Sequence, residues 1–224
     1  MQPLSFPGTL EDTAGREDLV WQIRPSLRPG NEGRYEVESQ IRGVAVWGVD
    51  FDGLEPSSSG DDASRARLPL NRAGEVSECV LTGELPCTAD GADQRLAITV
   101  NFRLDLRDVQ GRDPGKPMSL HLSATVAGID YAIDDDWFED GTLRLDQAMQ
   151  PAHRLRCCVT CLFSDYSPGG HGLMGIRCHR DARDQYLSVR SKTEYWSVPV
   201  TEEVPEIYLC DQYQQRVPGT GYRG

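Results

Sequence analysis

The chain has 224 residues, and its 35 acidic residues outnumber its 23 lysines and arginines, which gives a formal net charge of −12. This acidity argues against a nucleic-acid-binding protein, because phosphate binding depends on clustered cations. No stretch approaches the ~18 apolar residues of a membrane span, and residues 1–13 lack the basic and apolar regions of a signal peptide. We therefore expect a soluble, cytoplasmic protein that binds neither nucleic acid nor membranes.

The first expected elements in chain order are three short apolar-rich segments, at residues 19–23, 34–41 and 44–51. Turn residues separate the three segments, as expected of short β-strands. Residues 78–87 predict a further strand that ends at Pro86.

The clearest secondary-structure signal lies in residues 95–108, where six apolar residues alternate with polar ones. A period of two predicts a strand with one buried face and one wet face. The alternation recurs over residues 119–133 until Gly128 breaks it, as a bulge or bend would. Because residues 107–117 are rich in turn formers, we expect the two runs to pair antiparallel through a long hairpin.

One short helix is expected at residues 142–150, and Pro151 ends it. The acidic run at residues 134–140 precedes this helix and lacks the spaced ligand pattern of a calcium loop, so we expect a solvated acidic turn. Together these elements predict a mainly β fold for the first 151 residues, either an antiparallel β-sandwich or an open barrel.

The composition changes after Pro151, because five of the seven cysteines lie between Cys157 and Cys210. We therefore divide the chain into an antiparallel β domain, residues 1–151, and a cysteine-rich lobe, residues 152–224. The lobe either forms a separate module or packs into the same domain.

Four of these cysteines have the pattern of a structural zinc site. Cys158 and Cys161 form a Cys-x-x-Cys turn, and Cys178 and Cys210 follow singly. Four thiolates around tetrahedral Zn²⁺ make a closed, structural arrangement, so the lobe is expected to resemble a zinc ribbon. Two substitutes for these ligands stay open, namely Cys157 for the first and His179 for the third.

Other interpretations of the cysteines also stay open. Free thiols are often buried as small apolar groups, and this is the simplest interpretation of Cys79 and Cys87, although these two could also pair across a hairpin. Disulfides are uncommon in cytoplasmic proteins. A redox pair at Cys158 and Cys161 would need a parallel βαβ pattern that the sequence lacks.

The loop Ser164–Gly172 offers a hydroxyl, a carboxylate and an imidazole, at Ser164, Asp165 and His171. A nucleophilic site needs these groups within hydrogen-bond reach and an oxyanion hole nearby, and nothing in the sequence fixes that geometry. A surface loop supported by the metal is the simpler interpretation.

The C-terminal third resembles an uncharacterised bacterial family. The shared features are the Cys-x-x-Cys turn, an SDYSP loop at residues 164–168, a later single cysteine, a Glu-x-Tyr-Leu-Cys segment at residues 206–210, and a terminal GYRG. The resemblance covers residues 152–224 closely and residues 6–15 and 41–56 more loosely. It implies no activity.

The expected function is a non-enzymatic protein-binding module with a structural zinc, because the chain is acidic, β-rich and without a convincing catalytic constellation. A charge of −12 favours a basic protein partner, as for an immunity-type inhibitor. One alternative is a metal-dependent hydrolase that uses the Ser164–Gly172 loop, with Asp165, His171 and His179 near an open metal site. Another is a structural component of a larger assembly.

The C-terminal tail carries one further expectation. Tyr222 has a large apolar ring, and it lies only twelve positions beyond Cys210. We expect Tyr222 to pack against the cysteine-rich lobe, because burying the ring is favourable.

Overall fold

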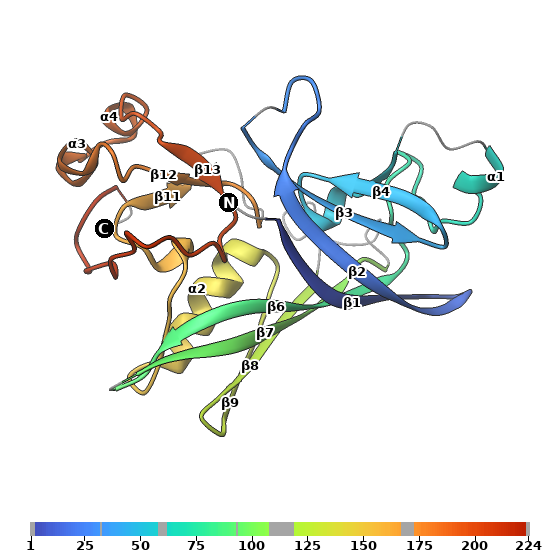
Figure 1. The fold of residues 1–224 in the computed structure, drawn as a ribbon, viewed down its shortest axis with the longest axis horizontal. Coiled ribbons are helices and arrows are strands. Elements are labelled where there is room, and N and C mark those ends of the chain that lie inside the picture. Colours follow the sequence, from blue (N-terminus) through green and yellow to red (C-terminus); the bar gives the residue numbers. More distant parts are fainter. Residues whose placement is uncertain are drawn as a thin grey trace.

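A computed structural model describes residues 3–31, 33–57, 62–92, 94–107, 119–166 and 173–222 (Figure 1). One antiparallel sheet runs in the spatial order β5-β4-β3-β2-β1-β6-β7-β8-β9, and β10 pairs with β6. The ten strands are β1 (Leu4–Asp12), β2 (Gly15–Pro25), β3 (Tyr35–Ile41), β4 (Val44–Gly48), β5 (Glu55–Pro56), β6 (Val80–Asp90), β7 (Arg95–Asp105), β8 (Ser119–Val126), β9 (Ile129–Asp135) and β10 (Arg154–Leu155). The mainly β, antiparallel prediction is confirmed. The strands form one continuous sheet, however, and do not divide into the two facing sheets of a sandwich.

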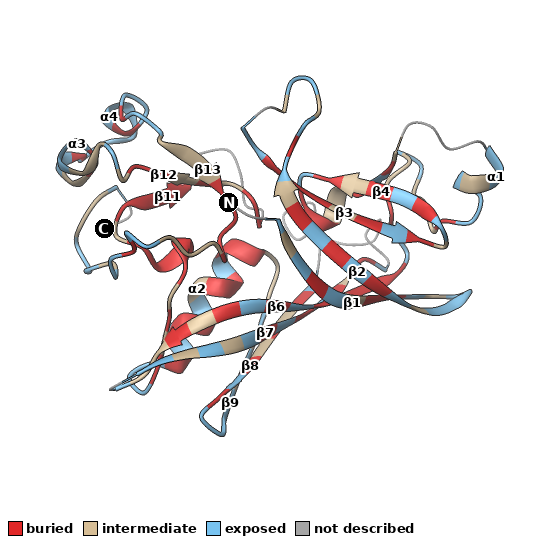
Figure 2. Cartoon of the chain, viewed as in Figure 1, coloured by how far each residue is buried: buried red, intermediate tan, exposed pale blue. Residues whose placement is uncertain are grey.

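The alternation that predicted the long strands is visible in their burial (Figure 2). β7 and β8 pair antiparallel as expected, with Phe102 opposite Leu122. Residues 108–118, the expected hairpin connection, lie outside the described residues. Gly128 lies in a tight turn with Ala127, and not in a bulge. Both residues have positive φ angles, of 51° and 82°, which is the geometry that joins β8 directly to β9.

The prediction for β6 was wrong at its end, because the strand continues through Pro86 to Asp90. On one side β6 pairs with β7 along its whole length. On its other side, β6 pairs with β1 only as far as Gly83, and its pairing with β10 begins at Ala89. Residues two apart direct their backbone groups to the same side, and Thr88 accepts its hydrogen bond from Arg156 on the β10 side. The backbone nitrogen of Pro86 therefore faces the gap between β1 and β10. No described strand would accept a hydrogen bond there, so the absence of an N–H costs no ladder bond.

The remaining elements are short helices, turns and a small second sheet. They include the 3₁₀ turns η1 (Phe51–Gly53) and η3 (Cys158–Thr160) and the helices α1 (Asp62–Arg65), α2 (Phe138–Met149), α3 (Arg183–Ser188) and α4 (Lys192–Tyr195). Among the helices, α2 packs against the large sheet, at β8, β9 and β10. A three-stranded sheet contains β11 (Ser164–Tyr166), β12 (Ile176–Cys178) and β13 (Glu202–Val204). Figure 1 shows the small sheet, α3 and α4 grouped together, with α2 between this group and β6–β9. None of the helices in the described ranges has the length and apolar character that a membrane crossing requires.

The expected helix is present, but the acidic run at residues 134–140 is only partly solvated, because Asp134 and Asp140 are exposed whereas Glu139 is buried. α2 starts at Phe138, four residues earlier than expected, and places Glu139 and Asp140 in its first turn. Asp135 accepts backbone hydrogen bonds from Asp136 at 2.7 Å and Trp137 at 3.2 Å, so this acid organises the turn before the helix.

Four aromatic rings from β2, η1, β7 and α2 pack together in the core. Phe51 lies 5.0 Å from Trp21, 4.8 Å from Phe102 and 5.8 Å from Phe138, measured between ring centroids. The same apolar core includes Leu173, Ile176, Val204 and Ile207 of the C-terminal lobe. Part of the lobe therefore shares the core of the sheet, and the rest of it packs around a second cluster that includes Phe163, Tyr186 and Tyr195.

Two strand glycines make room for these rings. Gly8 and Gly83 face each other across β1 and β6. The Trp21 indole passes over Gly8 and donates a 2.8 Å hydrogen bond to the carbonyl of Thr82. A Cβ at Gly8 would overlap with the indole and with that carbonyl oxygen.

We expect Gly8→Ala to destabilise the protein by about 3 kcal/mol, because overpacking at this site displaces Trp21 from its hydrogen bond. Gly53→Ala is the matched control, since a Cβ there meets nothing within 4 Å. Urea unfolding of the two variants measures the difference. Equal stabilities would contradict the role given to Gly8.

Candidate metal centre in the C-terminal lobe

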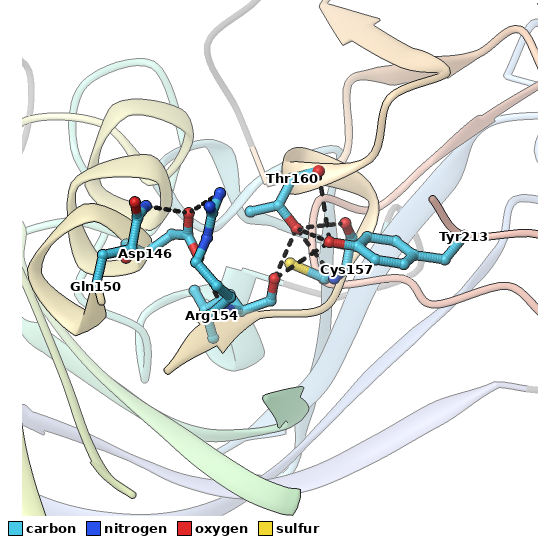
Figure 3. A network of polar contacts seen from close by, with 7 residues as sticks. Asp146, Gln150, Arg154, Cys157, Thr160 and Tyr213 are labelled. Atoms are coloured by element: carbon cyan, nitrogen blue, oxygen red, sulfur yellow. Dashed lines mark hydrogen bonds and ion pairs between the residues drawn. The ribbon is translucent and has the colours of Figure 1, made fainter. Parts of the chain in front are cut away.

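The turn at η3 presents two cysteines from one short loop. The N–H of Cys161 donates to the carbonyl of Cys158 at 3.0 Å, which closes the turn. Cys157 precedes the turn as its N-cap, and its N–H donates to the Thr160 hydroxyl at 3.4 Å. Figure 3 shows this hydroxyl between Cys157 and the Tyr213 phenol, which lies 3.0 Å from it. The side-chain bonds of Thr160 fix the turn that carries Cys158 and Cys161.

Cys178 lies on β12, which pairs with β11, the strand that follows the turn. β11 pairs with β12 so that Ser164 faces Cys178. The Ser164 hydroxyl donates to the carbonyls of Cys158 and, at 3.2 Å, Cys161. Ser164 thus links the Cys-x-x-Cys turn to the strand that carries the third cysteine.

Cys210 approaches from the C-terminal segment, which runs along the other side of the turn. Cys158 donates its N–H to the Tyr208 carbonyl at 2.6 Å, and Leu162 donates to the Gln214 carbonyl at 2.7 Å. Cys210 lies between these two attachment points. The segment that carries Cys210 is therefore bonded to the turn, and Cys178 is connected to it through the pairing of β12 with β11.

Burial raises the pKa of Cys158 well above its usual range, and charge on Cys161, Cys178 or Cys210 would raise it further. Cys178 differs, because Arg180 partly offsets the effect of burial on its pKa. The Arg180 guanidinium donates to the Cys178 sulfur at 3.4 Å and also contacts Glu202. Burial therefore favours the protonated thiol at Cys158 unless a nearby cation neutralises its thiolate.

All seven cysteines are free thiols, and six of them are buried. Among the described residues, no group of three or more His, Cys, Asp or Glu side chains is arranged to hold a metal ion.

His179, the substitute third ligand, has protein partners at both ring nitrogens. Its Nδ1 lies 2.9 Å from the Pro199 carbonyl, and its Nε2 lies 3.3 Å from the Tyr195 hydroxyl. The ring stacks on Tyr186 at 5.0 Å, and burial lowers the pKa of the imidazole. These contacts favour a neutral histidine that supports the lobe.

The Ser164–Gly172 loop is only partly described, because residues 167–172, including His171, lie outside the described residues. Ser164 is 1% exposed and its hydroxyl is bonded to backbone carbonyls. Asp165 is 2% exposed and accepts a 2.9 Å hydrogen bond from the Tyr186 hydroxyl. Both side chains thus have structural partners.

The tail packs as expected. The Tyr222 ring stacks on Tyr195 of α4, with centroids 5.0 Å apart and planes inclined by 20°. Gly221 lies against the Tyr186 ring, where a Cβ would be 2.6 Å from the phenol oxygen. The prediction that Tyr222 docks on the lobe is confirmed.

Sequence reasoning missed a group of buried carboxyls beside this lobe. Asp50 follows β4 and accepts backbone hydrogen bonds from Phe51 at 2.7 Å and Leu173 at 3.0 Å. Glu206 is fully buried, donates its N–H to the Leu173 carbonyl, and has one side-chain oxygen without a hydrogen-bond partner among the described residues. The available signal was a single glutamate within the otherwise apolar string around Ile207.

These carboxyls resist ionisation. Burial and the neighbouring Asp52 raise the pKa of Asp50 to about 7. Burial also raises the pKa of Glu206 well above its usual range, and Asp50 and Glu139 add to the effect. A charge on either group is unfavourable in the folded state.

A family model for a family of unknown function (DUF6304) matches residues 4–164. The chain belongs to this family. The match covers the large sheet and the Cys-x-x-Cys turn, whereas the resemblance noted in the sequence was closest over residues 152–224. No curated protein and no solved structure matches the chain.

In this DUF6304 protein we expect Glu206→Gln to raise thermal stability at pH 8 by several degrees and to change little at pH 5. The folded-state pKa of Glu206 is raised, so the folded protein holds more protons than the unfolded chain, and stability is lost as the pH rises above the unfolded value. The neutral amide removes that loss. Melting curves at both pH values measure the effect.

Glu84→Gln is the control for this experiment, because Glu84 is exposed on the sheet. A stability change in Glu206→Gln that is equal at pH 5 and pH 8 would contradict the burial of a titrating carboxyl.

Proposed function

We propose that the chain is a protein-binding module that presents the outer face of its large sheet to a basic protein. A structural zinc ion holds its C-terminal lobe. The observation that carries the binding role is that no described element covers the outer face of the ten-stranded sheet.

The outer face is broad and polar. Helix α2 and part of the lobe pack against the opposite face, where Leu10, Trp21 and Leu104 are fully buried. The outward side chains of the central strands are exposed and of mixed character. The uncharged ones include Pro7, Val20, Gln22, Thr99, Asn101 and Thr125, and the charged ones include Arg16, Asp18, Glu84 and Arg103. Such a surface can approach a partner without displacing any part of the fold.

Three adjoining hollows shape this face, and we call them together the outer-face trough. The first is about 540 Å³ and lies over β2, β1, β6, β7 and β8. The second, about 440 Å³, shares Asp18 and Leu19 with it, and the third, about 510 Å³, shares Asn101. The trough therefore extends across most of the sheet and favours a macromolecular partner over a small ligand.

The sign of the charge favours a basic partner. A net charge of −12 accelerates association with a cationic surface and makes the complex sensitive to salt. An immunity-type inhibitor of a basic toxin has this character. The hydrolase alternative is less well supported, because the Ser164 hydroxyl donates to two backbone carbonyls inside the lobe.

The zinc site of the proposal has Cys158, Cys161, Cys178 and Cys210 as its four ligands. Its support is the attachment of two further chain segments, β11–β12 and the C-terminal segment, to the η3 turn, since a closed thiolate site must collect ligands from separate segments. A Zn²⁺ ion would neutralise the mutual repulsion of the four thiolates, and Arg180 would offset the remaining negative charge.

To test the binding role, arginines are placed in the outer-face trough by Val20→Arg and Asn101→Arg. The tagged wild-type chain is expected to retain a basic protein from its native host at 50 mM salt and to release it at 500 mM salt. The double variant is expected to lose that protein, because it adds bulk and positive charge to the contact face. Quantitative mass spectrometry of the retained proteins gives the comparison.

Val217→Arg serves as the control, since Val217 is 55% exposed in the C-terminal tail. The binding role fails if no protein is lost selectively by the trough variant while Val217→Arg retains it.

To test the metal site, zinc is measured by elemental analysis in the purified chain and in two cysteine variants. We expect one zinc per wild-type chain, and its loss together with several kcal/mol of stability in Cys178→Ser, because structural zinc binding is coupled to folding. Cys79→Ala is expected to keep its zinc, since Cys79 is buried beside β6, outside the lobe. Zinc-free wild type, or equal zinc in both variants, would refute the site.

A further inference from the structure

The pairing register of β6 and β10 places two other cysteines, Cys87 and Cys157, at neighbouring positions. Arg154 faces Asp90, and Leu155 faces Ala89. Arg156 then donates its N–H to the Thr88 carbonyl at 2.8 Å. Continuing this register by one residue sets Cys157 opposite Cys87.

The backbone supports that continuation. Cys157 is extended, with φ of −158° and ψ of 175°. Its side chain lies on the same face as that of Leu155, two residues earlier, and both are 1% exposed. Cys87 likewise shares its face with Ala89, which is fully buried. Both thiols therefore enter the core from adjacent segments.

The position of β10 is fixed by α2, as Figure 3 shows. Asp146 accepts the N–H of Leu155 at 2.7 Å and forms a 3.1 Å ion pair with Arg154. Gln150 donates to the same carboxylate at 3.1 Å. These bonds hold the segment that carries Cys157 in register with β6.

The expected separation suits a disulfide. Because Arg156 and Thr88 occupy a hydrogen-bonded pair, the next pair along is a non-hydrogen-bonded one, with Cα atoms about 4.5 Å apart. Disulfides join cysteines whose Cα atoms are about 4.4–6.8 Å apart. Cys87 and Cys157 thus fall near the short end of that range.

We propose that Cys87 and Cys157 form a cross-strand disulfide when the chain meets a low-molecular-weight disulfide such as oxidised glutathione. One protein thiolate attacks a sulfur of the reagent and releases one glutathione thiolate. The other protein thiolate then attacks the mixed disulfide and releases the second. Two protein thiols are oxidised, the reagent disulfide is reduced to two thiols, and the two protons pass to the released glutathione.

The bond would connect residues 70 positions apart and tie the start of the lobe to β6. It also assigns the adjacent cysteines to different roles, with Cys157 in this pair and Cys158 at the zinc site. Because both sulfurs are buried, oxidation of the folded chain requires local opening of β10 and is slow.

The test uses the full zinc-loaded chain, unfolded and refolded in a buffer of oxidised and reduced glutathione with zinc present. Remaining thiols are alkylated and the chain is digested with trypsin without reduction. We expect a cross-link between the peptides 73–95 and 157–177, the loss of two free thiols, and a melting temperature several degrees above that of the reduced chain.

Variants assign the bond, because peptide 73–95 holds Cys79 and Cys87, and peptide 157–177 holds Cys157, Cys158 and Cys161. The cross-link should vanish in Cys87→Ala and Cys157→Ala and persist in Cys79→Ala. A cross-link that survives Cys87→Ala or Cys157→Ala, or no cross-link after refolding, would overturn the proposal. Zinc content measured on the same samples reports separately on the metal site.

Discussion

The C-terminal third of the protein depends on the backbone bonds made by the η3 turn. Cys158 and Val159 donate to the carbonyls of Tyr208 and Glu206, and Arg216 donates back to Thr160. A segment without regular secondary structure can be held this way, because its polar groups are satisfied by a fixed turn and not by a ladder. The same bonds attach the segment that carries Cys210 to the Cys-x-x-Cys turn. Any event that opens the turn would release the C-terminal segment and separate the cysteines.

Buried carboxyl groups reduce the stability of the contact between the lobe and the sheet when they ionise. Asp50 and Glu206 bracket Leu173 from opposite sides, one accepting its N–H and the other donating to its carbonyl. These bonds place the lobe accurately, but they draw two carboxyls into an apolar core. The protein therefore combines an uncovered, polar outer face with an inner face where the ionisation of a few acids opposes folding.

Much of the sheet follows from local pattern. The alternation in β7 and β8 identified both strands and their buried faces, because a half-buried strand requires a period of two. β1 escaped prediction, since Pro7 and Gly8 interrupt its pattern, and the need for Gly8 arises from Trp21 of the neighbouring strand. The full length of β6 could not be predicted from the sequence either. Pro86 is tolerated only because the strand on that side ends early, which is a property of the topology.

In the lobe, too, some features follow from the local sequence and others depend on distant contacts. The spacing of Cys158 and Cys161 indicates a tight turn, and the ring of Tyr222 favours docking, because both are local properties. The contact between Asp50 and Leu173 joins positions 123 residues apart. No local signal encodes such a contact, and the pairing of Cys87 with Cys157 likewise depends on the register of β10.

We propose that one zinc ion joins the η3 turn, β12 and the C-terminal segment that carries Cys210. X-ray absorption at the zinc edge on the purified, zinc-loaded chain identifies the ligands of that ion. The expected first shell contains four sulfurs at about 2.3 Å. A first shell that contains nitrogen or oxygen, or fewer than four sulfurs, would contradict the proposal.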